Sequence, residues 1–322
     1  MTAQAPRVYT KCKMGTRWIA IVVVGAVALL ASGCNLRAIL IKAQVDGTSE
    51  YTAAKAFEMS DPELVGPVMA DSIVTSNGFL YYVDDYEPLL LGAAFSRIAY
   101  GVGWLGYEAH ALELAGQFDE AERVSARAGV LYSSALRLAK RALRLRDEGF
   151  DAAVEGGLTS FKAWVDENFT RAQDAEVLLV AGAAYFTVMI ESEEGIAAAV
   201  DLPIGRYLVE RSIELDPELR GGLGYSIIGT FECSLPELMG GRPKVGMQFL
   251  EKALALTDRG SHGYLVTQAQ RCAVALQDRK LYHALLMEVI EAGDVPEYRL
   301  PNKLARREAE LLLKQTDEFF FD

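Results

Sequence analysis

A glycine pattern is the first feature of this sequence that could do chemistry. Gly101-Val-Gly103-Trp-Leu-Gly106 has the G-x-G-x-x-G spacing of a dinucleotide-binding turn. That turn needs a strand before it and a helix that opens at it. Here the pattern lies inside a long helical segment, and no parallel-sheet pattern surrounds it. We therefore expect small residues at helix contacts, or a break in the helix that shapes a cavity, and no nucleotide cofactor.

Residues suited to catalysis are scattered along the chain. The three histidines, His110, His262 and His283, are far apart, and neither a G-x-S-x-G elbow nor an H-E-x-x-H helix is present. Catalysis by a cysteine would need Cys233 or Cys272 beside a histidine, which the spacing does not support. We expect no enzyme, no metal site and no cofactor.

Cys34 is the residue with the clearest chemical role. It follows Leu30-Ala31-Ser32-Gly33, and such small residues before a cysteine form the processing box of bacterial lipoproteins, in which the thiol takes a lipid. Ala31 departs from the usual leucine at its place. Upstream, residues 1–33 contain four basic residues, no acidic residue and the apolar run 18–31, which is typical of an export signal. The alternative is an uncleaved signal anchor in which Cys34 is not modified.

This interpretation divides the chain into a signal peptide (1–33), a lipidated tether (34–60) that partly folds onto the body, and one helical domain (61–322). It places the protein in the periplasm on a bacterial membrane, and the Asn at position 35 favours the outer one. The whole chain carries 32 basic and 44 acidic residues, and residues 34–322 keep 28 and 44, for a net charge of −16. An acidic chain of this kind is not expected to bind nucleic acid.

Two cysteines remain besides the one that would carry the lipid. An exported protein can form a disulfide, but Cys233 and Cys272 both lie in apolar segments with helical spacing. We expect two buried free thiols.

Aromatic residues are the best candidates for a binding surface. Tyr100, Trp104 and Tyr107 belong to an aromatic cluster in the region 81–107, and Tyr185 and Tyr225 lie at matching positions of later helices. Most aromatic residues of these regions should be core. These five could instead line a groove for an apolar ligand or a partner.

Two basic stripes stand against the acidic background. One contains Arg137, Lys140, Arg141 and Arg144, and the other contains Arg299, Lys303, Arg306 and Arg307. A solvated helix face is the default interpretation, and a docking surface for an acidic partner or lipid headgroups is the alternative.

The elements that must position these residues are all helices, since helical spacing occurs throughout and no strand alternation is sustained. The apolar seam of residues 119–147 repeats every three or four residues, and Asp61-Pro62 is a helix start. The patterns predict helices at 62–78, 86–115, 119–148, 158–168, 174–191, 203–215, 221–234, 243–257, 261–276, 278–292 and 301–319.

A weak internal repeat joins these helices into pairs. Gly182 and Gly205 match Gly229 and Gly246 at positions that the tetratricopeptide (TPR) pattern gives to small residues. We therefore predict an all-α fold, an irregular TPR-like α-solenoid of antiparallel helix pairs with a groove along its inner helices.

Several strings in this order resemble one family. They are the lipoprotein box, Lys140-Arg-Ala-Leu-Arg-Leu-Arg-Asp147, Leu238-Met-Gly-Gly-Arg-Pro243 and Asn302-Lys-Leu-Ala-Arg-Arg-Glu-Ala-Glu-Leu-Leu312. Together they are similar to the T component of tripartite ATP-independent periplasmic (TRAP) transporters. The resemblance implies an accessory lipoprotein that forms a trimer, docks the solute-binding P component and binds or passes a hydrophobic ligand. The alternative is a general TPR lipoprotein scaffold for envelope assembly or secretion.

Overall fold

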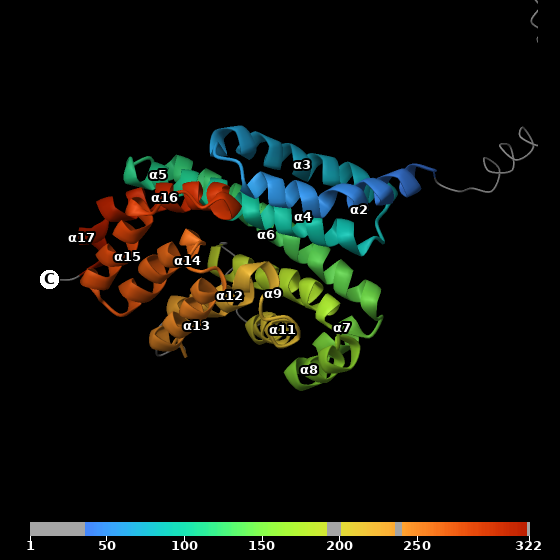
Figure 1. Cartoon of the computed structure of the whole chain (residues 1–322). Helices are drawn as coiled ribbons and strands as arrows, with labels where there is room; N and C mark the ends of the chain where they lie inside the picture. The colour runs from blue at the N-terminus through green and yellow to red at the C-terminus, as the bar shows by residue number, and fades with distance from the viewer. Residues whose placement is uncertain (1–35, 192–200, 236–239, 321–322) are drawn as a thin grey trace, which may run out of the picture.

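The chain folds into helices that pack as shown in Figure 1. The computed structural model describes residues 36–191, 201–235 and 240–320, and no strand occurs within these ranges. The predicted all-α class is therefore confirmed. The main helices are α2 (Leu36–Phe57), α3 (Pro62–Tyr82), α4 (Glu87–Tyr100), α5 (Tyr107–Leu114), α6 (Phe118–Arg146), α7 (Phe150–Glu155), α8 (Gly157–Asn168), α9 (Ala175–Glu191), α11 (Leu202–Leu215), α12 (Leu219–Ser234), α13 (Pro243–Leu256), α14 (His262–Thr267), α15 (Arg279–Glu291), α16 (Arg299–Lys314) and α17 (Thr316–Phe319).

The export signal and Cys34 lie outside the described residues. Residues 36–57 of the expected tether form helix α2, which packs on the body through Ala38, Ile41 and Val45. These three residues recur with helical spacing, so one side of α2 is apolar and docked. Leu36, the first described residue of α2, lies two residues after the predicted lipidation site.

Local sequence signals start several helices as expected. Asp61 caps α3, because its carboxylate accepts hydrogen bonds from the backbone N–H of Glu63 at 3.0 Å and of Leu64 at 3.2 Å. Pro62 occupies the first helical position, where its missing N–H costs nothing. Pro243 likewise occupies the first position of α13, and Pro88 and Pro203 occupy the second positions of α4 and α11.

Helix α6 is the long central helix, and its buried face is wider than the predicted seam. Ala121, Val124 and Ala128 are buried as expected, but farther along the helix Tyr132 and Leu143 are buried while Leu145 is exposed. A narrow apolar seam that repeats every seven residues suits one coiled-coil neighbour, whereas α6 contacts the three helices α4, α5 and α9. Three neighbours require a broader apolar face.

Two helix pairs pack through facing glycines. A Cβ at Gly205 of α11 would lie 2.6 Å from Cβ of Tyr185 on α9, and a Cβ at Gly229 of α12 would lie 2.9 Å from the carbonyl oxygen of Gly246 on α13. Neither pair could approach so closely with a side chain at these glycines. The glycines singled out by the repeat search therefore share one packing role, while the solenoid arrangement of the whole chain stays a prediction.

The expectation of two free thiols is wrong. Cys233 of α12 and Cys272 form a disulfide, with Cα atoms 4.8 Å apart. Both half-cystines are buried among apolar residues, as the sequence indicates, but they are brought together by the packing of α12 against η5 (Gln268–Ala273), the π-helical segment that follows α14. A disulfide is consistent with an oxidising compartment.

The C-terminal helices return to the N-terminal ones. Helix α16 contacts α14 and α15 and also α2, α3 and α5, and Figure 1 shows it beside α5. Among the described residues, the continuous helix Glu87–Leu114 is long and apolar enough to cross a membrane. Because Leu89, Leu90 and Ala94 of this helix lie in the main hydrophobic core, we assign it as a core helix.

Candidate functional site

The glycine pattern at Gly101–Gly106 forms a π-helical segment, η1, between α4 and α5. A Cβ at Gly101 would lie 2.9 Å from Cζ of Tyr132, so the glycine lets α6 approach. Gly103 lies against Leu304 of α16. The pattern therefore serves helix contacts, as expected, and the wider turn is of the kind often found at functional sites.

A pocket of about 490 Å³ opens beside this segment. Tyr100, Trp104 and Tyr107, three of the five aromatic residues proposed from the sequence, line it together. The rings of Tyr100 and Trp104 stack with centroids 6.0 Å apart. They form an apolar wall that could hold a flat or aliphatic group.

Helix α3 supplies the facing wall and fixes the orientation of the indole. Trp104 Nε1 donates a hydrogen bond to the carbonyl oxygen of Pro62 at 3.1 Å. A Cβ at Gly66 would lie 2.6 Å from this nitrogen, so only glycine leaves room for the ring. Pro62, Gly66 and Pro67 also line the pocket.

Charged residues lie around the aromatic wall. The Arg307 guanidinium of α16 donates to Glu63 of α3 at 2.6 Å and lies 5.8 Å from the ring centroid of Tyr107. Glu108 and Gln117 line the pocket as well. The site therefore combines an apolar wall with a cation and two carboxylates, which can orient a ligand by its polar end.

A polar cluster lies next to the pocket on the junction of α5 and α16. His110 Nδ1 is 2.8 Å from Oε1 of Glu308, which also accepts from Gln270 Nε2 at 3.3 Å. The hydrogen bond to Glu308 raises the pKa of His110, although partial burial opposes it. Sequence reasoning did not pair these residues, because 198 positions separate His110 from Glu308.

The other two proposed aromatic residues lie away from this pocket. Tyr185 is buried in the main core, where burial raises the pKa of its phenol. Tyr225 is half-buried and stacks on Phe249, with ring centroids 6.2 Å apart. Cys34 lies outside the described residues, so its lipidation stays a prediction.

The basic stripes are largely paired with acids. Arg144 meets Asp151 at 2.7 Å, Arg141 meets Asp84 at 3.5 Å and Lys140 meets Asp201 at 3.7 Å. In the second stripe Arg299 pairs with Asp294, and Arg306 pairs with Glu310. Charges already paired on their own surface favour the solvated-face interpretation over a docking stripe.

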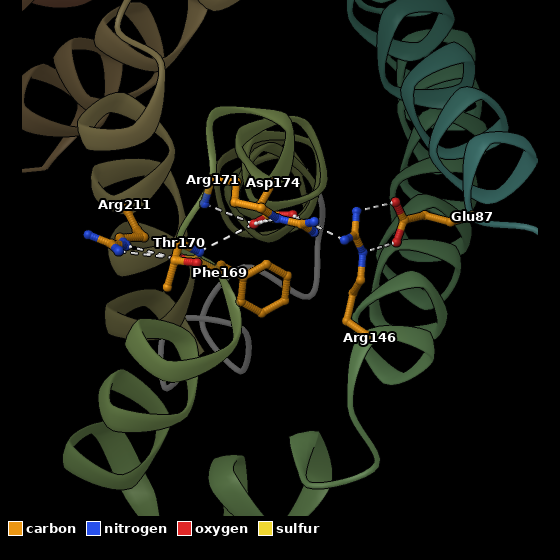
Figure 2. Close-up of polar contacts among 7 residues, drawn as sticks. All are labelled: Glu87, Arg146, Phe169, Thr170, Arg171, Asp174 and Arg211. Atoms are coloured by element: carbon orange, nitrogen blue, oxygen red, sulfur yellow. Dashed lines mark hydrogen bonds and ion pairs between the residues drawn. The ribbon is translucent and has the colours of Figure 1, made fainter.

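Figure 2 shows that the C-terminal end of α6 makes ion pairs within the fold. Arg146, the last residue of α6, donates to Glu87 of α4 at 2.6 Å and to the buried Asp174 at 3.1 Å. Asp174 also accepts from the backbone N–H and the guanidinium of Arg171. Burial opposes ionisation of Asp174, but the hydrogen bonds and charge of Arg171 and the backbone N–H of Thr170 together outweigh burial and lower the pKa of Asp174.

Other motif residues also hold the scaffold. Arg242 pairs with Glu232, which is fully buried, and Arg206 meets the same carboxylate at 2.9 Å. Asn302 accepts from the N–H of His262 at 2.9 Å and donates to the carbonyl oxygen of Gly260 at 2.8 Å. Arg242 and Asn302 therefore fix junctions between helices, whereas Arg307 of the same C-terminal string lines the pocket.

Comparison with known families gives one match. A family model described as the TRAP transporter T-component matches residues 58–320. No curated protein matches the chain. In the described part of the chain no cluster of three potential metal ligands occurs.

Proposed function

The chain belongs to the TRAP transporter T-component family, and from this membership we propose that it is a lipid-anchored accessory subunit that docks the solute-binding P component. The family supports an accessory role in TRAP transport and a place in the bacterial envelope. The proposal adds anchoring through Cys34, with the outer membrane favoured, and assembly as a trimer by analogy with the family.

The aromatic pocket is the observation that supports a ligand-handling role. Its volume of about 490 Å³ lies within the range of about 300–1,000 Å³ typical of small-molecule sites. Stacked rings at Tyr100 and Trp104 favour an apolar group, and Arg307 with Glu63 can orient a polar one. We therefore propose binding or passage of a hydrophobic ligand, without a chemical step.

The position of the pocket connects ligand handling with docking. Its walls come from α3, from η1 with α5, and from Arg307 of α16, and the side chain of Glu63 is 80% exposed. A P component that contacts this rim would cover the opening. Ligand could then move between the two proteins with little contact with water.

A substitution that fills the pocket tests this role. Ala111 lines the pocket on the half-exposed side of α5, so Ala111→Phe adds a ring there with little disturbance of the core. The probe is the apolar dye anilinonaphthalene sulfonate. We expect the fluorescence enhancement of the dye to fall with Ala111→Phe and to stay unchanged with the matched control Ala126→Phe, which lies at an exposed position of α6. Equal enhancement in both variants would reject the pocket as the ligand site.

A general TPR lipoprotein scaffold is the second candidate. The two glycine-packed helix pairs, α9 with α11 and α12 with α13, favour it, because such pairs commonly build peptide-binding surfaces. The two functions differ in their partner. Co-purification with a solute-binding protein encoded beside a TRAP permease supports the first, and co-purification with envelope-assembly factors alone supports the second.

A further inference from the structure

The first two turns of α2 carry an apolar face that points away from the body. Leu36, Ile39 and Leu40 are 63%, 56% and 60% exposed, and Ala43 is exposed as well. At 3.6 residues per turn these four side chains share one side of the helix. Exposed aliphatic residues clustered at helical spacing indicate a surface that something else covers.

The opposite side of the same turns is already docked. Ala38, Ile41 and Val45 pack on the hydrophobic core. Arg37 and Lys42 lie between the two faces, each roughly 110° around the helix from the centre of the outward face. A surface helix with an apolar face between two cations matches the charge distribution of a phospholipid interface, whose phosphates lie just above the acyl chains.

Two tyrosines at the end of α3 lie beside this face. Arg37 donates to the Tyr82 hydroxyl at 3.2 Å and lies 5.4 Å from its ring centroid. Tyr81, which is 83% exposed, meets the Tyr82 ring edge-on with centroids 5.1 Å apart. Tyrosine is enriched where proteins meet lipid headgroups, because its ring is apolar and its hydroxyl is polar.

The distance to the predicted lipid favours one occupant. Leu36 follows Cys34 by two residues, which span at most about 7 Å when fully extended. If Cys34 carries the lipid, the start of α2 therefore lies close to the bilayer surface. No long linker separates the two.

We propose that Leu36, Ile39 and Leu40, together with Tyr81 and Tyr82, form a lipid-facing surface that rests the body directly on the phospholipid bilayer. The orientation rests on the proposed lipidation of Cys34, whereas the affinity of the surface for lipid does not. Helix α3 has 21 residues and is about 30 Å long, so its Pro62 end, which borders the aromatic pocket, is about 30 Å along the helix from Tyr82. The lipid-facing surface and the aromatic pocket therefore lie at opposite ends of α3, and the pocket lies outside the surface that contacts lipid.

Flotation of the unacylated protein with vesicles tests the surface without the anchor. The mature chain with Cys34→Ser is mixed with vesicles of phosphatidylethanolamine and phosphatidylglycerol. We expect it to float. We expect Ile39→Glu to lower the partition coefficient by roughly tenfold or more, since the substitution removes an aliphatic side chain that enters the lipid and adds a charge. Val130→Glu is the matched control, because Val130 is 68% exposed on α6. Failure of the parent chain to float, or equal flotation with Ile39→Glu, contradicts the proposal.

A second measurement uses the anchored protein. With Cys34 acylated and Cys233 bonded to Cys272, Ile39→Cys provides a single free thiol in the mature chain for an environment-sensitive dye. Quenching by nitroxide lipids at position 39, but not in Val130→Cys, supports the lipid-facing surface. Equal quenching at both positions overturns the proposal. A doubled molecular mass that Ile39→Glu abolishes also overturns it, because it indicates that the surface is a contact between two copies of the chain. An unmodified Cys34 in the mass spectrum would count against the proposed lipidation alone.

Discussion

The contact between Gly229 of α12 and Gly246 of α13 gives the sharpest prediction for the scaffold. A Cβ at Gly246 would lie 2.6 Å from the carbonyl oxygen of Gly229 and 3.1 Å from Cβ of Glu232. These are backbone or near-backbone atoms, so no flexible side chain can move aside. Gly246→Ala therefore has to push the two helices apart, next to the disulfide that joins α12 to η5.

Two opposing effects set the magnitude. Overpacking a core costs about 1–3 kcal/mol, and a clash with backbone belongs at the upper end of that range. Alanine in a helix interior gains about 1 kcal/mol over glycine. We expect Gly246→Ala to lower the free energy of unfolding by about 2 kcal/mol. Gly92 of α4 is the control, because it is exposed and a Cβ there would meet nothing within 4 Å.

Urea unfolding of the oxidised protein measures both variants. Gly92→Ala should raise the free energy of unfolding by about 0.5–1 kcal/mol, while Gly246→Ala should lower it. The opposite signs separate helix propensity from packing. Equal or greater stability of Gly246→Ala would show that the helices do not approach as closely as the structure has them, and would refute the reasoning about the repeat.

Four further predictions concern the disulfide, two titrating groups and the anchor. Reduction of Cys233–Cys272, which are 39 residues apart, should lower stability by up to roughly 4 kcal/mol through loop entropy, measured by urea unfolding with and without reductant. Because Asp174 has a lowered pKa, its ion pairs stabilise the fold at pH values above the pKa of an unfolded aspartate, and this stability is lost as pH falls through the folded-state pKa. Asp174→Asn should therefore be less stable at neutral pH and should lose stability less steeply in acid. Because His110 has a raised pKa, its contribution to stability is complete at pH values below the pKa of an unfolded histidine and is lost as pH rises through the folded-state pKa. An NMR titration of the histidine and pH-dependent unfolding of His110→Gln measure this effect. Mass spectrometry of the native protein should find Cys34 acylated at the N-terminus, and an intact Met1 would contradict export processing.

Local patterns predicted most helices because the signals are local. Asp61 with Pro62 starts α3, and the spacing of apolar residues in α6 marks its buried face. The helix at 36–57 is harder to predict from sequence, since Gly47, Thr48 and Ser49 within it are weak helix formers. Its docking depends on partners in α3, α4 and α16 that local spacing does not reveal.

The pocket was only partly predictable. The sequence indicated Tyr100, Trp104 and Tyr107 as members of an aromatic cluster that could line a groove, and the structure brings these three to one pocket. The opposite walls, Gly66 and Arg307, come from elements distant in the chain, and nothing local connects them. Tyr185 has the right residue type at a repeat position, but that face of α9 is turned into the core.

The disulfide was mispredicted for a related reason. Apolar surroundings correctly indicated burial of Cys233 and Cys272, but burial says nothing about which buried thiols meet. Their contact requires the packing of α12 against η5, and the two cysteines are 39 residues apart in the sequence.

Binding of the P component is the direct test of the proposed accessory role. The purified lipidated protein is titrated with the solute-binding protein encoded beside its TRAP permease, and the dissociation constant is measured by calorimetry. We expect saturable binding that Ala111→Phe at the pocket weakens and Ala126→Phe on α6 leaves unchanged. No binding, or equal binding by both variants, would contradict docking at the pocket.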